Sequence, residues 1–222
     1  MIHTYSLIHD DLPGMDNDDY RRGRLTNHKV FGEGFAILAG DGLLNYAYEC
    51  ILKNALDYGA NLEGHILAAR EIAQRAGVGG MVAGQSIDLL SEHREPNEAT
   101  LYYIHMHKTA DLLTAPLLAA AYIAGADEKS IAALRTFGAC VGLAFQIDDD
   151  LLDVMGDAKD LGKQTGMDEQ RGKMTWPSLV GVEAAQKKSR ELWTQAEEAL
   201  AVFGDSAWFL REFAEALAKR KK

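Results

Sequence analysis

Two clusters of aspartates are the residues of this sequence best suited to chemistry. The first comprises Asp10, Asp11 and Asp16, with Pro13 between the acids. Because proline cannot continue a helix interior, we expect Asp10 and Asp11 to occupy the last turn of a helix and Asp16 to return toward it from the loop. The three carboxylates could then converge. The spacing differs from that of a calcium-binding EF-hand loop, and a solvated acidic turn is the alternative interpretation of this cluster taken alone.

The second cluster lies within an apolar segment that has the periodicity of a helix. Four polar residues follow the helical spacing i, i+3, i+4 and i+7 and should share one face: Gln146, Asp149, Asp150 and Asp153. In the preceding turns the same face is small and apolar, at Ala139, Gly142 and Leu143. A face that changes from apolar to acidic predicts the wall of an apolar pocket with a charged mouth. An ordinary acidic helix face is the alternative.

Carboxylates held this close together repel one another, so a multivalent cation is the simplest way to keep them ionised. Hard oxygen ligands select magnesium or manganese. Magnesium keeps several waters and binds few protein carboxylates together with phosphate oxygens. We therefore expect the two clusters to bind a diphosphate through the metal ion.

A diphosphate also needs fixed positive charge, and basic residues stand after each cluster and between them: Arg21, Arg22, Lys108, Lys163 and Lys173. Arginine forks suit phosphate oxygens. Any single lysine could instead be an ordinary surface residue. Gln85 and Asp88 lie three apart, where they could orient a basic side chain or water, or simply bond within the core. The seven histidines show no shared metal spacing, and we assign none as a ligand.

The elements that must position these groups are helices throughout. Apolar residues recur at helical spacing, and alternating strand patterns bounded by hairpin turns are missing, so the predicted class is all-α. We expect helices at 1–11, 34–57, 63–77, 80–92, 97–125, 128–154, 178–203 and 205–220. Two charged, glycine-rich stretches, 12–32 and 156–177, should be irregular. The absence of a repeat favours one helical bundle around a central apolar cavity, a single domain over 1–222.

Composition narrows the function classes further. The chain is 47% hydrophobic, which indicates a folded core. Its net charge of -10 excludes the basic surface that nucleic-acid binding requires. Cys50 and Cys140 lie far apart and no signal peptide is visible, so a reducing cytoplasm is expected. Leu112 to Ala126 is shorter than a bilayer span and should be a buried core helix. We expect the basic run at 219–222 to be a solvated tail.

The two acidic clusters and their companions resemble the trans-isoprenyl diphosphate synthases, closest to the bacterial farnesyl and geranylgeranyl diphosphate synthases. The segment from Asp10 to Asp16, followed by Arg21-Arg22-Gly23, is similar to the first aspartate-rich motif of the family in its longer bacterial form. The segment from Gln146 to Asp153 resembles the second motif. Lys108-Thr109 and the glycine-lysine pairs at 162–163 and 172–173 fall in the family's order. The resemblance extends over essentially the whole chain.

The resemblance implies roles for these residues. Asp10, Asp16 and Asp149 would ligate magnesium, supported by Asp11, Asp150 and Asp153. The allylic diphosphate would be held by Arg21, Lys108 and Lys163, and isopentenyl diphosphate by Arg22, with Lys173 a further substrate-binding residue. Thr109 and Gln146 would line the reacting centre beside the developing allylic cation. The expected partners are these two diphosphates and, as in the family, a second copy of the chain in a homodimer.

One family motif, Gly-Gly-Lys-x-x-Arg-Pro, is absent and would lie upstream of Met1. The segment from Ile2 to Asp11 also reads as the end of a longer helix without a cap. We therefore expect the chain to be an N-terminally incomplete or short relative. A geranylgeranyl diphosphate synthase, a noncatalytic partner subunit and a class I terpene cyclase are the alternatives to a farnesyl diphosphate synthase. The cyclase is disfavoured because such enzymes usually carry an Asn/Ser/Glu metal triad in place of the second aspartate motif.

Product length provides the first test. In the family, bulk on the helix before the first aspartates closes the pocket, and here Tyr5 followed by Ser6 resembles the farnesyl-forming pattern. Tyr5→Ala should therefore lengthen the product beyond fifteen carbons, as measured by separating extracted products by length. An unchanged product would remove Tyr5 from the length-setting residues.

Overall fold

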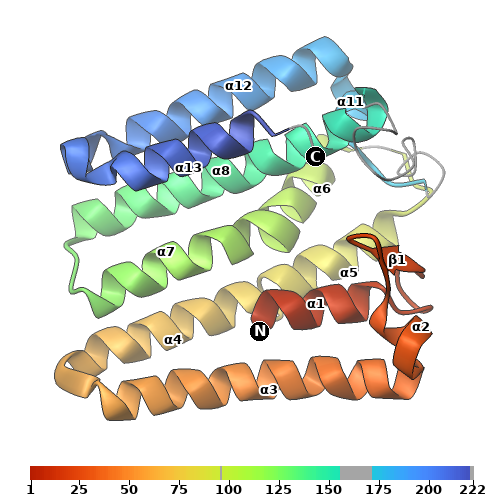
Figure 1. The fold of residues 1–222 in the computed structure, drawn as a ribbon. Coiled ribbons are helices and arrows are strands. Elements are labelled where there is room, and N and C mark those ends of the chain that lie inside the picture. Colours follow the sequence, from red (N-terminus) through yellow and green to blue (C-terminus); the bar gives the residue numbers. More distant parts are fainter. Residues whose placement is uncertain (96, 156–171, 221–222) are drawn as a thin grey trace. The chain divides into compact units, whose positions relative to one another are not determined.

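The computed structural model describes residues 1–95, 97–155 and 172–220 and is helical over most of that length (Figure 1). The contacts between residues divide the chain into two compact units, Met1–Ala69 and Arg70–Lys222, which are described separately. The expected all-α class is confirmed.

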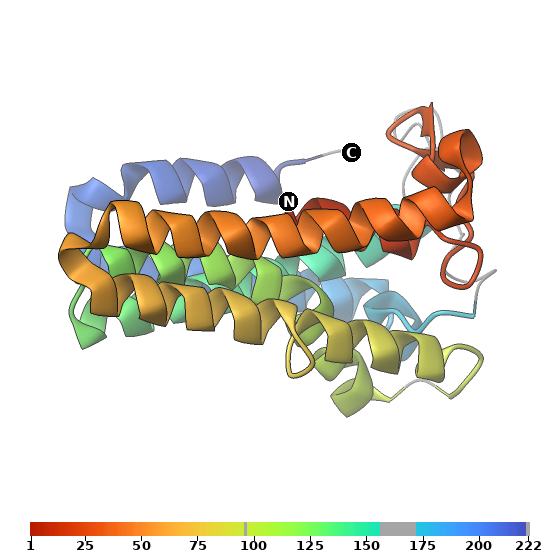
Figure 2. The ribbon, with the colours of Figure 1, turned by 90° about the horizontal axis from the view of Figure 1, so that it is seen from below.

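The first unit is built on two helices joined by a short polar segment. Its elements are α1 (Ile2–Asp10), β1 (Tyr20–Arg21), β2 (Arg24–Leu25), α2 (Asn27–Phe31), α3 (Glu33–Asp57), a 3-10 turn (Gly59–Asn61) and the start of α4 (Leu62–Ala76). Helix α1 lies along the longer α3 (Figure 1 and Figure 2). The ring of His9 hydrogen-bonds the carbonyl of Ile37 at 3.0 Å. A Cβ at Gly40 would come within 2.0 Å of that ring, so this glycine permits the two helices to approach.

The stretch 12–32, expected to be irregular, contains a small hairpin and a short helix. Strands β1 and β2 pair antiparallel, with Tyr20 opposite Leu25. The two turn residues, Arg22 and Gly23, both have positive φ, at 53° and 73°. That is the requirement of a type I′ turn. Arginine is an unusual residue for its first position, which is why the sequence pattern did not reveal the hairpin.

The second unit contains the remaining helices: the end of α4, then α5 (Met81–Ser91), α6 (Glu98–Ile104), a π-helix (His105–Ala110), α7 (Asp111–Ile123), α8 (Glu128–Met155), α11 (Trp176–Val180), α12 (Val182–Ala199), a 3-10 segment (Leu200–Ala207) and α13 (Trp208–Ala218). The single helix expected at 97–125 is thus α6, the π-helix and α7 in continuous succession. Helix α11 begins inside the stretch expected to be irregular, because Thr175 forms a capping box with Ser178 and Pro177 occupies the first turn. Residues 156–171 of that stretch lie outside the described residues.

Helix α8 is the centre of the second unit. It packs against α7 on one side and α12 on the other, and Figure 1 shows α13 running beside it as well. Phe137 and Ile147 are among its side chains that are almost completely buried. By length and composition α8 could cross a membrane, but half of its apolar window is buried inside the structure. That burial is the pattern of a core helix.

The π-helix is held between two glycines on its neighbours. A Cβ on Gly84 of α5 would lie 2.2 Å from the backbone nitrogen of Lys108. A Cβ on Gly142 of α8 would lie 2.3 Å from the Cα of Ala110. Gly142, expected on a pocket wall, therefore packs against backbone. Both neighbouring helices approach the π-helix so closely that its unusual backbone has little freedom to relax.

The contact at Gly142 predicts a stability difference between two glycine substitutions. Gly142→Ala should lower the free energy of unfolding by about 1–3 kcal/mol, because the added methyl overpacks the interface with the π-helix. Gly42→Ala in α3, where nothing lies within 4 Å of the added Cβ, should be neutral or raise it by up to about 1 kcal/mol. Urea denaturation of both variants measures the difference. Equal stability of the two would contradict the close packing of α8 on the π-helix.

Candidate active site

The predicted site residues fall into two groups, one in each unit. The first half-site, in the first unit, contains the end of α1, the loop after it and the hairpin. The second half-site, in the second unit, contains the π-helix and the last turns of α8. Each is described by itself.

The end of α1 has the predicted geometry. Helix α1 ends at Asp10, and the backbone N–H of Asp16 donates to the carbonyl of Asp10 at 2.9 Å. The N–H groups of Met15 and Asn17 both donate to the carbonyl of Leu12, at 2.9 and 3.1 Å. This turn returns the chain, so the expectation that Asp16 comes back to the helix end is confirmed.

Arg21 forms a forked contact with the buried carboxylate of Asp11. Its Nε donates to Oδ1 and Oδ2 at 2.9 and 3.0 Å, and its Nη2 donates to Oδ1 at 2.6 Å. Asp11 is 3% exposed, and Asp10 Oδ2 lies 3.8 Å from the same Nη2. Burial lowers the pKa of Arg21, but the hydrogen bonds and charge of Asp11, with Asp10 and Asp18 nearby, offset this and leave the pKa above its ordinary value. Arg21 therefore stays charged, while Arg22 stands exposed at the hairpin turn.

Tyr5 lies inside the first unit. It is 7% exposed and meets the ring of His9 edge to face, with centroids 5.7 Å apart. Burial raises its pKa, and Tyr48 of α3 adds to the shift. The hydroxyl of Ser6 donates to the carbonyl of His3 within the helix. The role of Tyr5 and Ser6 in product length stays a prediction.

In the second unit, the predicted face of α8 is joined to the π-helix by hydrogen bonds. The hydroxyl of Thr109 donates to Oε1 of Gln146 at 2.8 Å, and Nε2 of Gln146 donates to Oδ1 of Asp150 at 3.3 Å. Gln146 and Asp150 therefore share a face. The neighbouring Asp148 points elsewhere and accepts from Ser189 and Trp193 of α12. It anchors helices and is not part of the candidate site.

Lys108 is oriented by α5. Its Nζ donates to Oδ2 of Asp88 at 2.6 Å, so the suggestion that Asp88 orients a basic side chain is confirmed. Lys173 is half-buried, and Lys163 lies outside the described residues. Both remain predicted substrate-binding residues.

Arg220 is a contributor that the sequence interpretation missed. Its guanidinium lies over the ring of Phe145, 3.5 Å from the centroid, and its Nη2 donates to the carbonyl of Phe145 at 2.9 Å and to Oδ1 of Asp149 at 3.3 Å. Burial lowers its pKa, opposed by Asp149 and Asp148. The expectation of a solvated tail is therefore wrong for Arg220. The signal was the order of helices: after α12 runs back along α8, α13 returns the chain to the acidic end of α8 (Figure 1).

Burial divides the predicted magnesium ligands into two sets. Asp11, Asp150 and Asp153 are 3, 3 and 7% exposed. The other three, Asp10, Asp16 and Asp149, are more accessible; the Asp149 side chain is 43% exposed, with the cation of Arg220 beside it. In the part of the chain that is described, no three acidic, histidine or cysteine side chains are grouped as a metal cage. Accessible carboxylates fit magnesium that is shared with phosphate oxygens, because magnesium takes only a few protein carboxylates.

His105 begins the π-helix and is buried behind the acidic face of α8. It is 3% exposed, its Nδ1 receives the indole N–H of Trp176 at 3.0 Å, and its Nε2 lies 3.6 Å from Oδ2 of Asp150. Burial lowers its pKa to about 3, with Asp88 opposing and Lys108 adding to the shift. His105 is therefore neutral at pH 7. The sequence offered only a lone histidine on an apolar helix, without any indication of its partners.

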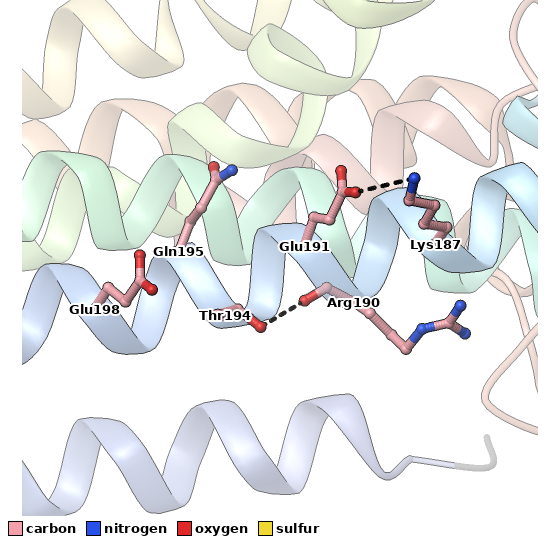
Figure 3. Close-up of a pocket in the computed structure, with 6 residues that line it drawn as sticks. All are labelled: Lys187, Arg190, Glu191, Thr194, Gln195 and Glu198. Carbon is pink, nitrogen blue, oxygen red and sulfur yellow. Dashed lines mark hydrogen bonds and ion pairs between the residues drawn. The ribbon is translucent and has the colours of Figure 1, made fainter.

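A surface hollow elsewhere in the second unit contains none of the predicted residues. Figure 3 shows that all of its lining side chains come from α12: Lys187, Arg190, Glu191, Thr194, Gln195 and Glu198. Within that helix Lys187 and Glu191 form an ion pair at 3.8 Å, and Gln195 accepts from the thiol of Cys140 in α8. It is not a candidate active site.

Comparison with known proteins identifies the family of this chain. Residues 1–202 match the family model described as polyprenyl synthetase. The chain is 46% identical over 200 residues to the farnesyl diphosphate synthase of Micrococcus luteus, covering 90% of this chain and 67% of the relative. It is equally 46% identical over 211 residues to geranylgeranyl pyrophosphate synthase 3, chloroplastic, of Arabidopsis thaliana, covering 93% of this chain and 58% of the relative. Across several such relatives the chain spans 57% to 73% of their length.

Solved structures show the same fold. The structure is similar to an FPP/GFPP synthase from Zymomonas mobilis, with a TM-score of 0.86, 37% identity and coverage of 97% of this chain and 72% of that one. A geranyltransferase from Helicobacter pylori, complexed with magnesium and isoprenyl diphosphate, gives a TM-score of 0.82 at 35% identity, with coverage of 97% and 70%. The helical fold that the resemblance to the isoprenyl diphosphate synthases implies is confirmed.

The neutral state of His105 predicts a loss of stability in acid. Because its folded-state pKa of about 3 lies below the ordinary 6.5, the unfolded chain binds a proton that the folded chain does not. The contribution of His105 is therefore fully present above pH 6.5 and is lost as the pH falls toward 3. The free energy of unfolding should drop by about 2 kcal/mol between pH 6.5 and 5 through this residue.

Urea unfolding at the two pH values measures this drop. His105→Gln should reduce the pH dependence, whereas His93→Asn, which changes an exposed histidine, should leave it as in the wild type. The same pH dependence in His105→Gln and wild type would exclude His105 as the source.

Proposed function

We propose, because this chain belongs to the polyprenyl synthetase family, that it provides the catalytic residues of a trans-prenyltransferase. The reaction joins isopentenyl diphosphate to an allylic diphosphate, dimethylallyl or geranyl. The observation that carries the proposal is that each unit has an acidic helix end with a basic side chain already oriented beside it. These are Asp10 and Asp11 with Arg21, and the end of α8 with Lys108 next to Thr109.

The accessible carboxylates are suited to magnesium. Asp10 and Asp16 in the first half-site and Asp149 in the second would hold it, and bound magnesium would neutralise charge on the departing diphosphate. The Helicobacter pylori relative was solved with magnesium and isoprenyl diphosphate, which supports the same cofactor here. Binding at Asp149 must displace Arg220 or share the carboxylate with it.

The basic side chains have roles that follow from their geometry. Lys108 is held by Asp88, so its ammonium group is already positioned and loses little further side-chain freedom when it binds a phosphate oxygen. Arg21 keeps its charge next to Asp11 and Asp10. Arg22, Lys163 and Lys173 are the additional proposed contacts to the two diphosphates.

The chemical step needs little covalent participation by the protein. The carbon–oxygen bond of the allylic diphosphate breaks and leaves an allylic cation. The double bond of isopentenyl diphosphate attacks that cation, and the proton lost from the product passes to the released diphosphate. Thr109 and Gln146 contribute oxygen atoms beside the cation, so catalysis consists of positioning and electrostatic stabilisation.

The proposed product is farnesyl diphosphate, on the basis of Tyr5. The relatives include farnesyl and geranylgeranyl synthases at the same 46% identity, so overall identity does not decide between them. Geranylgeranyl diphosphate is therefore the second candidate product.

The proposal extends to a homodimer in the cytoplasm. Along α3 several large apolar side chains are exposed, among them Phe35, Leu38, Leu52 and Leu56 at 71, 66, 62 and 83%. Such a surface favours burial against another protein surface. A noncatalytic subunit is the alternative function; diphosphate binding without turnover, with turnover restored by a different partner chain, would favour it.

The experiment is a product assay with magnesium, geranyl diphosphate and labelled isopentenyl diphosphate. A fifteen-carbon product is expected. Asp10→Ala and Asp149→Ala should each lower kcat/KM by about 100-fold or more, because each removes charge stabilisation of the departing diphosphate.

Asp57→Ala and Asp205→Ala are the matched controls, one exposed aspartate in each unit outside both half-sites, and they should retain activity. Full activity in Asp10→Ala and Asp149→Ala would refute the proposed magnesium ligands. A twenty-carbon product would support the second candidate product instead.

A further inference from the structure

We infer that His105 and Trp176 are positioning residues that fix the direction of the hydrogen bond between Thr109 and Gln146. The inference rests on the proposed function, in which these two side chains face the allylic cation. Neither His105 nor Trp176 reaches that centre in the structure; they act through Asp150.

Trp176 holds two partners at once. Its backbone N–H donates to Oδ2 of Asp150 at 2.9 Å, and its indole N–H donates to Nδ1 of His105 at 3.0 Å. Trp176 is 4% exposed and His105 3%. The capping box of Thr175 fixes the backbone at the start of α11. Both hydrogen bonds are therefore shielded from water and held by local structure.

The indole contact determines where His105 carries its proton. An indole nitrogen is only a donor, so Nδ1 of His105 must accept. The proton of the neutral ring is then on Nε2, which faces Oδ2 of Asp150 at 3.6 Å. That distance is longer than a hydrogen bond, but it places the positive end of the N–H dipole against the carboxylate. His105 and Trp176 together hold the carboxylate of Asp150 in this position.

The position of the Asp150 carboxylate in turn fixes the orientation of the Gln146 amide. An ionised carboxylate can only accept, so the amide nitrogen of Gln146 must face Asp150 Oδ1, as it does at 3.3 Å. The amide oxygen is thereby turned to the hydroxyl of Thr109, which donates to it at 2.8 Å. A flip of the amide would bring its oxygen against the carboxylate and repel it.

The consequence is electrostatic. Because the hydroxyl proton of Thr109 is used in the bond to Gln146, the hydroxyl oxygen is left with lone pairs and no proton for other contacts. Lone pairs stabilise a cation, whereas an amide N–H or a hydroxyl proton aimed at it would repel it. Breaking the series of hydrogen bonds that connects Trp176 to Thr109 should therefore slow the step in which the cation forms more than it weakens the binding of the diphosphates.

The structure offers a matched control on the same helix. The indole N–H of Trp193 donates to Oδ2 of Asp148 at 2.8 Å, so it is also a tryptophan that fixes an aspartate of α8. Asp148 has no hydrogen bond to Gln146 or Thr109 among the contacts described above. Trp176→Phe and Trp193→Phe thus remove the same kind of bond, and only the first is connected to the proposed reacting centre.

The test compares steady-state kinetics of the wild type, Trp176→Phe, His105→Phe and the double variant, with Trp193→Phe as control. Trp176→Phe should lower kcat by about 10-fold and leave the KM of both diphosphates within about 2-fold, because misdirected groups lose positioning rather than substrate contacts. The double variant should be no slower than His105→Phe alone, since residues that act as one unit are not additive. Thermal unfolding of each variant identifies losses that come from misfolding.

Nitrogen NMR of the His105 ring tests the same geometry without activity. In the wild type, Nδ1 should be unprotonated and Nε2 protonated, and Trp176→Phe should shift this ratio while Trp193→Phe should not. A kcat of Trp176→Phe equal to that of Trp193→Phe, or a proton on Nδ1 in the wild type, overturns the inference. An inactive wild type with the expected ring protonation refutes the proposed function and leaves the hydrogen-bond direction supported.

Discussion

A carboxylate taken out of water must receive hydrogen bonds or charge, and this requirement organises both half-sites. In the first, Asp11 is almost fully buried and is matched by the guanidinium of Arg21. In the second, Asp150 is equally buried and is matched by donors from Trp176 and Gln146. The accessible aspartates next to them keep oxygen atoms near the surface. Each half-site thus combines an internal carboxylate that fixes geometry with external ones suited to a cation.

The π-helix allows two adjacent residues, Lys108 and Thr109, to contact different neighbouring helices. Regular helical spacing would continue the register of α6 into α7. The wider turn from His105 to Ala110 shifts that register, and Gly84 and Gly142 allow the flanking helices to close on it. The result is that Lys108 reaches Asp88 while Thr109 reaches Gln146.

The sequence predicted the site best where the spacing of polar residues matches the period of a helix or where a proline ends one. The pairing of Gln146 with Asp150 and the return of Asp16 to the end of α1 follow from spacing and from Pro13, and the structure confirms both. The contacts of His105 and Arg220 could not be obtained in this way, because they join residues 71 positions apart. The hairpin turn at Arg22 was missed for a different reason: Arg22 has a positive φ, and an arginine in a sequence does not indicate one.

The contact of Arg220 with Asp149 has a practical meaning for handling the protein. An affinity tag attached after Lys222 would be only a few residues from a guanidinium that packs on Phe145 and balances a predicted metal ligand. Any change that removes or displaces Arg220 takes away the cation beside Asp149. Preparations that differ only in this tail should be treated as different proteins when their magnesium requirement is compared.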